Sequence, residues 1–129
     1  MSFTYDDFAK TGAIKYFKVN IITETVRDLY YLSHIKKYLQ EQKGIKDEKE
    51  TTSGTVKIVT ELINQNYCIL ATWGKEKGSF EEITITPEEL HKLVDQYNTT
   101  NAFPFDYFLI ATEKSKEWVV RYKKLIDEL

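Results

Sequence analysis

The stretch from residue 53 to residue 97 restricts the fold of this chain more than any other part. Helical spacing of apolar residues gives way to strand alternation over 67–73, which is followed by the polar, glycine-bounded turn 74–78. A second apolar strand comes next. The sequence Thr86-Pro87-Glu88-Glu89 then has the composition of a helix start, with a capping hydroxyl, a proline and carboxylates in the first turn. The stretch therefore predicts a helix, a β-hairpin and a helix, in that order.

The first third of the chain predicts one long helix. Apolar residues recur at three- and four-residue steps from Ile22 to Leu39, which is the spacing of an amphipathic helix. Thr23 is the expected N-cap of this helix, and Gly44 is the expected stop. The polar segment 43–52 is then expected to be a flexible loop.

The remaining elements complete a small domain. The helix after the loop is expected to be capped by Ser53 or Thr55, the apolar run 105–111 to be a central strand, and Thr112 to cap the last helix. A chain of 129 residues with 42% hydrophobic content is the size of one domain with its own core. We therefore predict a single α+β domain, residues 1–129, with four main helices around a small, mainly antiparallel sheet.

The composition indicates a reducing compartment and no membrane partner. Cys68 is the single cysteine, so the chain forms no internal disulfide. No apolar run approaches the roughly 20 residues that cross a bilayer. Asp6 and Asp7 stand where a signal peptide would carry cations and an apolar stretch. We expect a cytoplasmic protein.

Charge is distributed unevenly along the chain, although the net charge is only −2. Residues 76–113 carry 8 acidic and 2 basic side chains, whereas residues 1–75 carry 9 acidic and 11 basic ones. An acidic segment inside an almost neutral protein favours a basic partner over nucleic acid.

No group of residues predicts a reaction. His34 and His91 lie on different predicted helices, without cysteine or histidine neighbours at metal-ligand spacing. Cys68 lies in the middle of an apolar strand, where a cysteine usually behaves as a small hydrophobic residue. The carboxylate pairs 81–82 and 88–89 have no spacing specific to hydrolysis. We expect no catalytic residue, no metal and no cofactor; an enzyme with a carboxylate site stays open as an alternative.

From Ile22 onward the expected order of elements resembles a winged helix, with two helices followed by the hairpin 67–85 as the wing. The segment 108–115, FLIATEKS, is similar to the strand-to-helix ending of many winged-helix proteins, with Ser115 in place of the usual glycine. A DNA-binding member would place a basic helix in the major groove. The helix 53–65 offers only Lys57 as a cation, beside Glu61. Because phosphate contacts dominate the affinity for DNA, a DNA-binding transcriptional regulator is only the alternative function.

A second resemblance covers residues 56–119. Three segments carry it: the pattern V-x-E-L-I-x-x-x-Y-x-I-L-A-x-W over 59–73, the helix start Thr86-Pro87-Glu88-Glu89-Leu90, and the strand at Tyr107 and Phe108. They are similar to small winged-helix-like immunity proteins of bacterial toxin–immunity systems of the contact-dependent growth inhibition type. The resemblance implies a non-enzymatic protein that binds one cognate toxin domain, often a basic nuclease, and blocks it in the cytoplasm.

The candidate binding residues are acidic, because an inhibitor of a basic nuclease needs carboxylates that imitate phosphates and accelerate encounter. One candidate patch follows the hairpin and the next helix, and a second lies in the predicted loop. The first patch contains Glu76, Glu81, Glu82, Glu88, Glu89 and Asp95, and the second contains Asp47, Glu48 and Glu50.

Overall fold

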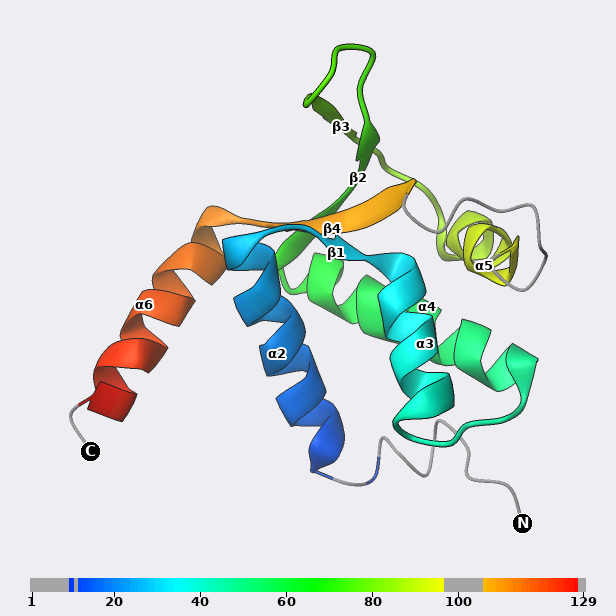
Figure 1. Ribbon diagram of the computed structural model, residues 1–129, viewed down its shortest axis with the longest axis horizontal. Helices are drawn as coiled ribbons and strands as arrows, with labels where there is room; N and C mark the ends of the chain where they lie inside the picture. Colours follow the sequence, from blue (N-terminus) through cyan, green and yellow to red (C-terminus); the bar gives the residue numbers. More distant parts are fainter. Residues whose placement is uncertain (1–9, 11, 97–105, 128–129) are drawn as a thin grey trace.

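A four-stranded antiparallel sheet with the strand order β1-β4-β2-β3 organises the chain (Figure 1). The computed structural model describes residues 10, 12–96 and 106–127. Its elements are α2 (Ala13–Arg27), β1 (Tyr30–Tyr31), α3 (Leu32–Glu41), α4 (Glu48–Asn64), β2 (Cys68–Trp73), β3 (Phe80–Glu82), α5 (Pro87–Asp95), β4 (Tyr107–Ala111) and α6 (Glu113–Asp127). The predicted single α+β domain is confirmed, although the described residues contain five helices rather than four. No helix in this part of the chain is both long enough and apolar enough to cross a membrane.

One face of the sheet packs on the helices α2, α3 and α4, which lie below it in Figure 1. The register places Leu109 of β4 opposite both Tyr30 and Leu70, so these three side chains share a face. Leu70 and Leu109 belong to the main core, and Tyr30 packs against it. The other face carries the next residues along each strand, including Phe108, Ala71 and Trp73.

The helix predicted from Ile22 to Leu39 is wrong, because the chain forms two helices with a strand between them. The helix α2 ends at Arg27, and Asp28 is extended, with φ −159° and ψ −171°. The two residues of β1 then pair with β4, and α3 begins at Leu32. Thr23 is not an N-cap but lies inside α2, where its hydroxyl donates to the Val19 carbonyl at 2.9 Å.

The predicted loop 43–52 is also wrong in its second half, where α4 has already begun at Glu48. Asp47 is the N-cap, and its carboxylate accepts from the backbone nitrogens of Lys49 at 2.9 Å and Glu50 at 3.2 Å. Ser53 and Thr55 are therefore interior residues of the helix. Polar composition concealed the helix, because the threonines of its first turns are buried against the protein interior.

The predicted end of α3 and start of α5 are both present. Gly44 follows α3 with φ +66°, in the left-handed region that glycine tolerates. Thr86 caps α5 in a reciprocal capping box with Glu89: the Thr86 hydroxyl accepts from the Glu89 backbone nitrogen at 3.1 Å, and the Glu89 carboxylate accepts from the Thr86 nitrogen at 3.1 Å.

The start of α6 is tied to the carbonyls that follow α4. The Thr112 hydroxyl donates to the Asn66 carbonyl at 2.6 Å, and Lys114 Nζ donates to the Gln65 carbonyl at 2.6 Å. The hydroxyl of the fully buried Ser115 donates to the Tyr67 carbonyl. Thr112 also accepts from the Ser115 nitrogen at 3.3 Å, as the predicted cap. These bonds join the end of α4, the start of β2 and the end of β4, so the hairpin β2–β3 projects from a fixed base.

Candidate protein-binding surface

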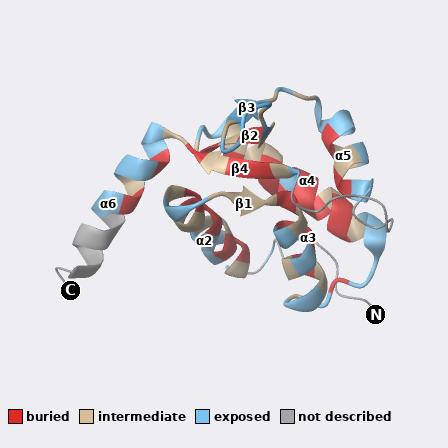
Figure 2. Cartoon of the chain, turned by 45° about the horizontal axis from the view of Figure 1, so that its top comes forward, coloured by how far each residue is buried: buried red, intermediate tan, exposed pale blue. Residues whose placement is uncertain are grey.

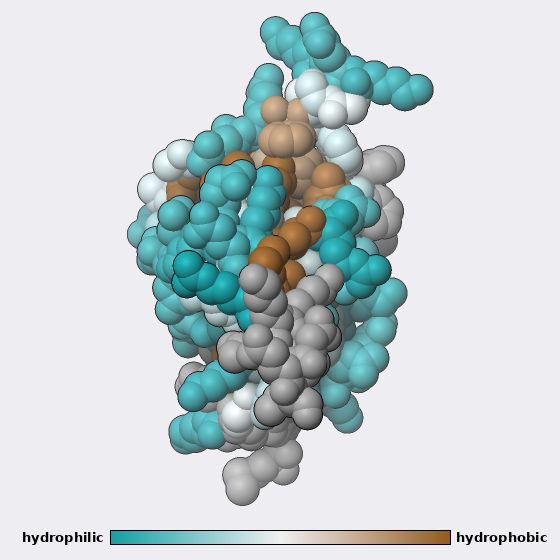
Figure 3. Space-filling model, turned by 90° about the vertical axis from the view of Figure 1, so that its left-hand side faces the viewer, coloured by the Kyte–Doolittle hydropathy of each residue, from teal (hydrophilic) through white to brown (hydrophobic). Residues whose placement is uncertain are grey.

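Two large aromatic side chains lie on the outer half of the β2–β3 hairpin. Trp73 pairs with Phe80 across the two strands, and their side chains are 44% and 51% exposed. The Trp73 ring also packs on Phe108, with ring centroids 4.7 Å apart. Figure 3 shows hydrophobic surface directly beneath the hydrophilic tip of the hairpin. Exposed aromatic residues on a braced hairpin have the composition of a protein-binding hot spot.

A shallow groove continues this apolar surface beyond Phe80. It has a volume of about 260 Å³ and is lined by apolar side chains that include Leu29 and Ile110. Charged residues of both signs also line it: Arg27, Asp28 and Lys116. The apolar surface therefore extends from the hairpin across the sheet toward α2 and α6, away from the acidic residues of β3.

The turn at the tip of the hairpin has a backbone geometry that requires its glycines. The Gly74 nitrogen donates to the Ser79 carbonyl at 2.9 Å, and a Cβ on Gly74 would lie 2.3 Å from Ser79 Oγ. Gly78 has φ +86°. Glu76, the first residue of the predicted acidic patch, lies at this tip between Lys75 and Lys77, so the two lysines outweigh its charge.

The strand β3 carries the least balanced acidic residues. All three of its side chains are exposed (Figure 2), and Glu81 and Glu82 point to opposite faces because strand residues alternate. Glu82 lines a crevice of about 210 Å³ that also includes Pro87 and Leu90 at the start of α5. The structure therefore brings Glu82 beside the start of α5, whereas Glu88 lines a different depression.

The two glutamates in the first turn of α5, Glu88 and Glu89, make different contacts. Glu88 is exposed and lines a separate depression of about 420 Å³ with Lys57, His91 and Lys92. Lys92 is four residues from Glu88 and therefore its neighbour on the helix. Glu89 closes the capping box, so its carboxylate is already occupied by Thr86.

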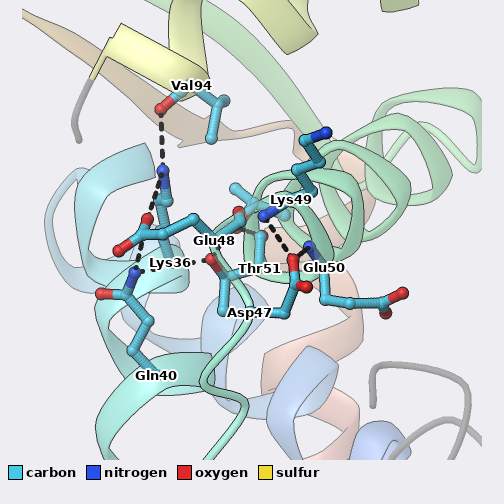
Figure 4. A network of polar contacts seen from close by, with 9 residues as sticks. Lys36, Gln40, Asp47, Glu48, Lys49, Glu50, Thr51 and Val94 are labelled. Atoms are coloured by element: carbon cyan, nitrogen blue, oxygen red, sulfur yellow. Dashed lines mark hydrogen bonds and ion pairs between the residues drawn. The ribbon is translucent and has the colours of Figure 1, made fainter. Parts of the chain in front are cut away.

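Of the remaining candidates, Glu48 pairs with Lys36, whereas Asp47 and Glu50 lie at the start of α4, where the Glu50 side chain points away from Lys36 (Figure 4). The Lys36 side chain is 3% exposed; its Nζ donates to the Val94 carbonyl at 3.3 Å and pairs with Glu48 at 3.7 Å. Burial lowers the pKa of Lys36, and the charges of Glu48 and Asp95 oppose that shift. Glu48 also accepts from Gln40 at 3.3 Å. Glu48 and Asp95, predicted to lie on two binding patches, are thus brought together on one lysine that joins α3, α4 and α5.

Cys68 and the histidines form no arrangement for catalysis in the described part of the chain. Cys68 is buried, and burial raises the pKa of its thiol to about 11, against a hydrogen bond with Thr25. His34 stacks edge-on against Tyr30 and Tyr31, with ring centroids 6.0 and 5.4 Å away, and burial lowers its pKa. His91 lies on α5, and the described residues contain no group of acidic, cysteine or histidine side chains able to hold a metal ion.

Sequence reasoning missed the aromatic part of this surface and the role of Lys36. Trp73 and Phe80 fit the apolar alternation of their strands, which predicts burial. A usable signal was their position next to a glycine-bounded polar turn, where a hairpin extends beyond its supporting helices. The chain matches no protein-family model, no curated protein and no solved structure.

Proposed function

We propose that this chain is an immunity protein that binds and neutralises a cognate bacterial toxin domain in the cytoplasm, and that it binds through the β2–β3 hairpin. The exposed pair Trp73 and Phe80, next to the carboxylates of Glu81 and Glu82, is the observation that supports this proposal. Aromatic anchors contribute most of the binding energy in protein interfaces, and charges around them set the rate of encounter. A toxin domain with a basic surface, such as a nuclease, complements this arrangement.

The alternative of a DNA-binding regulator has less support from the geometry. The helix α4 contains the segment that the DNA-binding alternative takes as its recognition helix, and Glu61 on it pairs with Lys18 of α2. Its first turn carries Glu48 and Glu50. A DNA-binding helix needs cations at the phosphates, so binding of duplex DNA with a steep salt dependence would support the regulator instead.

The test of the proposal begins with the gene directly upstream in the source genome. An immunity protein is expected to follow the gene of a large exported toxin. Expression of the C-terminal domain of that toxin should stop bacterial growth, and co-expression of this chain should restore growth and allow both proteins to be purified together. Growth arrest that persists despite a folded, abundant chain would contradict the proposal.

A further inference from the structure

We propose that the free edge of β3 accepts a short basic strand of the partner protein, which extends the sheet by one strand. This inference rests on the proposed protein-binding function and specifies how the partner is held. Among the residues that the structure describes, β3 is the last strand of the sheet and pairs only with β2, and none of its residues is buried. An exposed sheet edge offers backbone donors and acceptors to an added strand.

The register defines which backbone groups are available. The Gly74 nitrogen donates to the Ser79 carbonyl, and the Ile83 nitrogen donates to the Leu70 carbonyl, each at 2.9 Å, so these bonds bracket the strand. Antiparallel pairing alternates inward and outward residues. The backbone groups of Glu81 therefore face β2, whereas the N–H and C=O groups of Phe80 and Glu82 point outward. Between them these two residues present two donors and two acceptors along the edge.

The side chains define the chemistry of the added strand. Glu81 stands on one face of β3, and Phe80 and Glu82 stand on the other. Opposite charges on directly paired residues stabilise a sheet, and aromatic residues pair well with β-branched ones. A strand with lysine or arginine opposite Glu81 and an apolar residue opposite Phe80 therefore fits this edge.

The same rule disfavours a second copy of this chain as the occupant. In the register in which all three residues of two β3 strands overlap, a two-fold axis would place Phe80 opposite Glu82 and Glu81 directly opposite Glu81. Glu81 would then face its own copy in a non-hydrogen-bonded pair, where the side chains are closest. Like charges in that position are destabilising. A basic strand from another protein is therefore favoured at this edge over a fully overlapping second copy of β3.

The first test uses the whole protein and a six-residue peptide of alternating lysine and valine. Amide hydrogen exchange is followed by NMR with and without the peptide. The peptide should slow exchange of the Phe80 and Glu82 amides by about tenfold, because a new partner carbonyl protects them. A matched peptide with methylated valine nitrogens, and one with glutamate in place of lysine, should leave both amides unprotected. Unchanged exchange with the lysine peptide, equal protection by all three peptides, or concentration-dependent dimerisation through β3 would overturn the inference.

The second test separates this inference from the proposed function. Glu82→Pro removes the charge and the outward N–H, whereas Glu82→Gln removes only the charge. The toxin domain should bind the proline variant about tenfold more weakly than the glutamine variant, because an edge hydrogen bond is lost and the ring blocks the edge. Circular dichroism checks that both variants are folded. If the toxin is neutralised but binds the two variants with equal affinity, strand addition is overturned and the immunity function stands. If the lysine peptide protects both amides but the chain does not neutralise the toxin, the immunity function is overturned and strand addition at β3 stands.

Discussion

At the scale of single residues, Lys36 provides the clearest test of how charge is used inside this protein. Its side chain is almost fully buried, and its partners include the Val94 backbone carbonyl and the half-exposed Glu48, with the charge of Asp95 also acting on it. Replacing a buried ion with an apolar side chain of similar size is often neutral or stabilising. We therefore expect Lys36→Met to keep or increase the free energy of unfolding measured in urea. Glu48→Gln should lower it by about 1 kcal/mol or less, because the buried ammonium group loses the counter-charge of Glu48 while that of Asp95 remains and solvent reaches the exposed side of the pair.

The double variant supplies the control for this prediction. In the Lys36→Met background there is no buried ammonium group, so Glu48→Gln should have almost no effect on the free energy of unfolding. An equal loss in both backgrounds would mean that Glu48 acts on the helix start of α4 and not on Lys36.

Cys68 predicts a defined loss of stability at high pH. The unfolded thiol ionises near its ordinary pKa of 9.0, whereas burial keeps the folded thiol protonated to about pH 11. The unfolded state therefore binds fewer protons between these values, so the free energy of unfolding falls as pH rises from 9 to 11. Cys68→Ala removes this contribution, so the free energy of unfolding of the wild-type protein should fall by about 2 kcal/mol relative to that of the variant across this range. Urea titrations from pH 8 to pH 11 measure the free energy of unfolding of both proteins. Curves of this free energy against pH that stayed parallel would contradict the prediction.

At the scale of secondary structure, Asp47 separates a capping role from a binding role. It was a candidate binding residue, and the structure places it at the N-cap of α4. Asp47→Ala should lower the free energy of unfolding by about 1 kcal/mol, whereas Asp47→Asn keeps an acceptor and should change it by only a few tenths. Thermal and urea unfolding measure both. If the asparagine variant is stable but fails to bind the toxin domain, the charge of Asp47 belongs to the interface after all.

Among the helices and strands, those defined by contacts between neighbouring residues could be predicted from sequence, and those defined by long-range pairing could not. The start of α5 was predictable because Thr86, Pro87 and Glu89 act on neighbouring residues. The strand β1 was not, because it exists only through its pairing with β4, which lies almost 80 residues further along the chain. The apolar spacing on either side of it, which continues from α2 into α3, hid the break. Long-range pairing leaves no local pattern in two residues.

The residues of the candidate site likewise divide into those whose exposure follows from their own type and those whose exposure depends on the assembled fold. Exposure of Glu81, Glu82 and Glu88 was predictable from their charge. The burial of Lys36 depends on how three helices meet, and the exposure of Trp73 and Phe80 depends on how far the hairpin extends beyond the helical layer. Both are properties of the assembled fold that no short window of sequence contains.

At the scale of the whole molecule, the location of charge matters more than its total. Glu81 and Glu82 lie on the edge strand, whereas Glu41 at the end of α3 and Glu117 on α6 are equally exposed acidic residues on other elements. The pair Glu81→Lys and Glu82→Lys changes the net charge by the same amount as Glu41→Lys and Glu117→Lys. Long-range attraction depends on net charge, and local steering depends on where the charge lies.

We expect the hairpin pair of reversals to slow association with the toxin domain by about tenfold or more at low salt, and the control pair to slow it much less. Glu89 should not be reversed in this experiment, since its loss would open the capping box of α5 and lower stability. Surface plasmon resonance at several salt concentrations measures both rates, and circular dichroism verifies folding. Because salt screens exposed charges, the difference between the two pairs should shrink as salt rises. Equal association rates for the two pairs at low salt would show that the acidic residues of β3 do not face the partner, and would move the interface to another part of the surface.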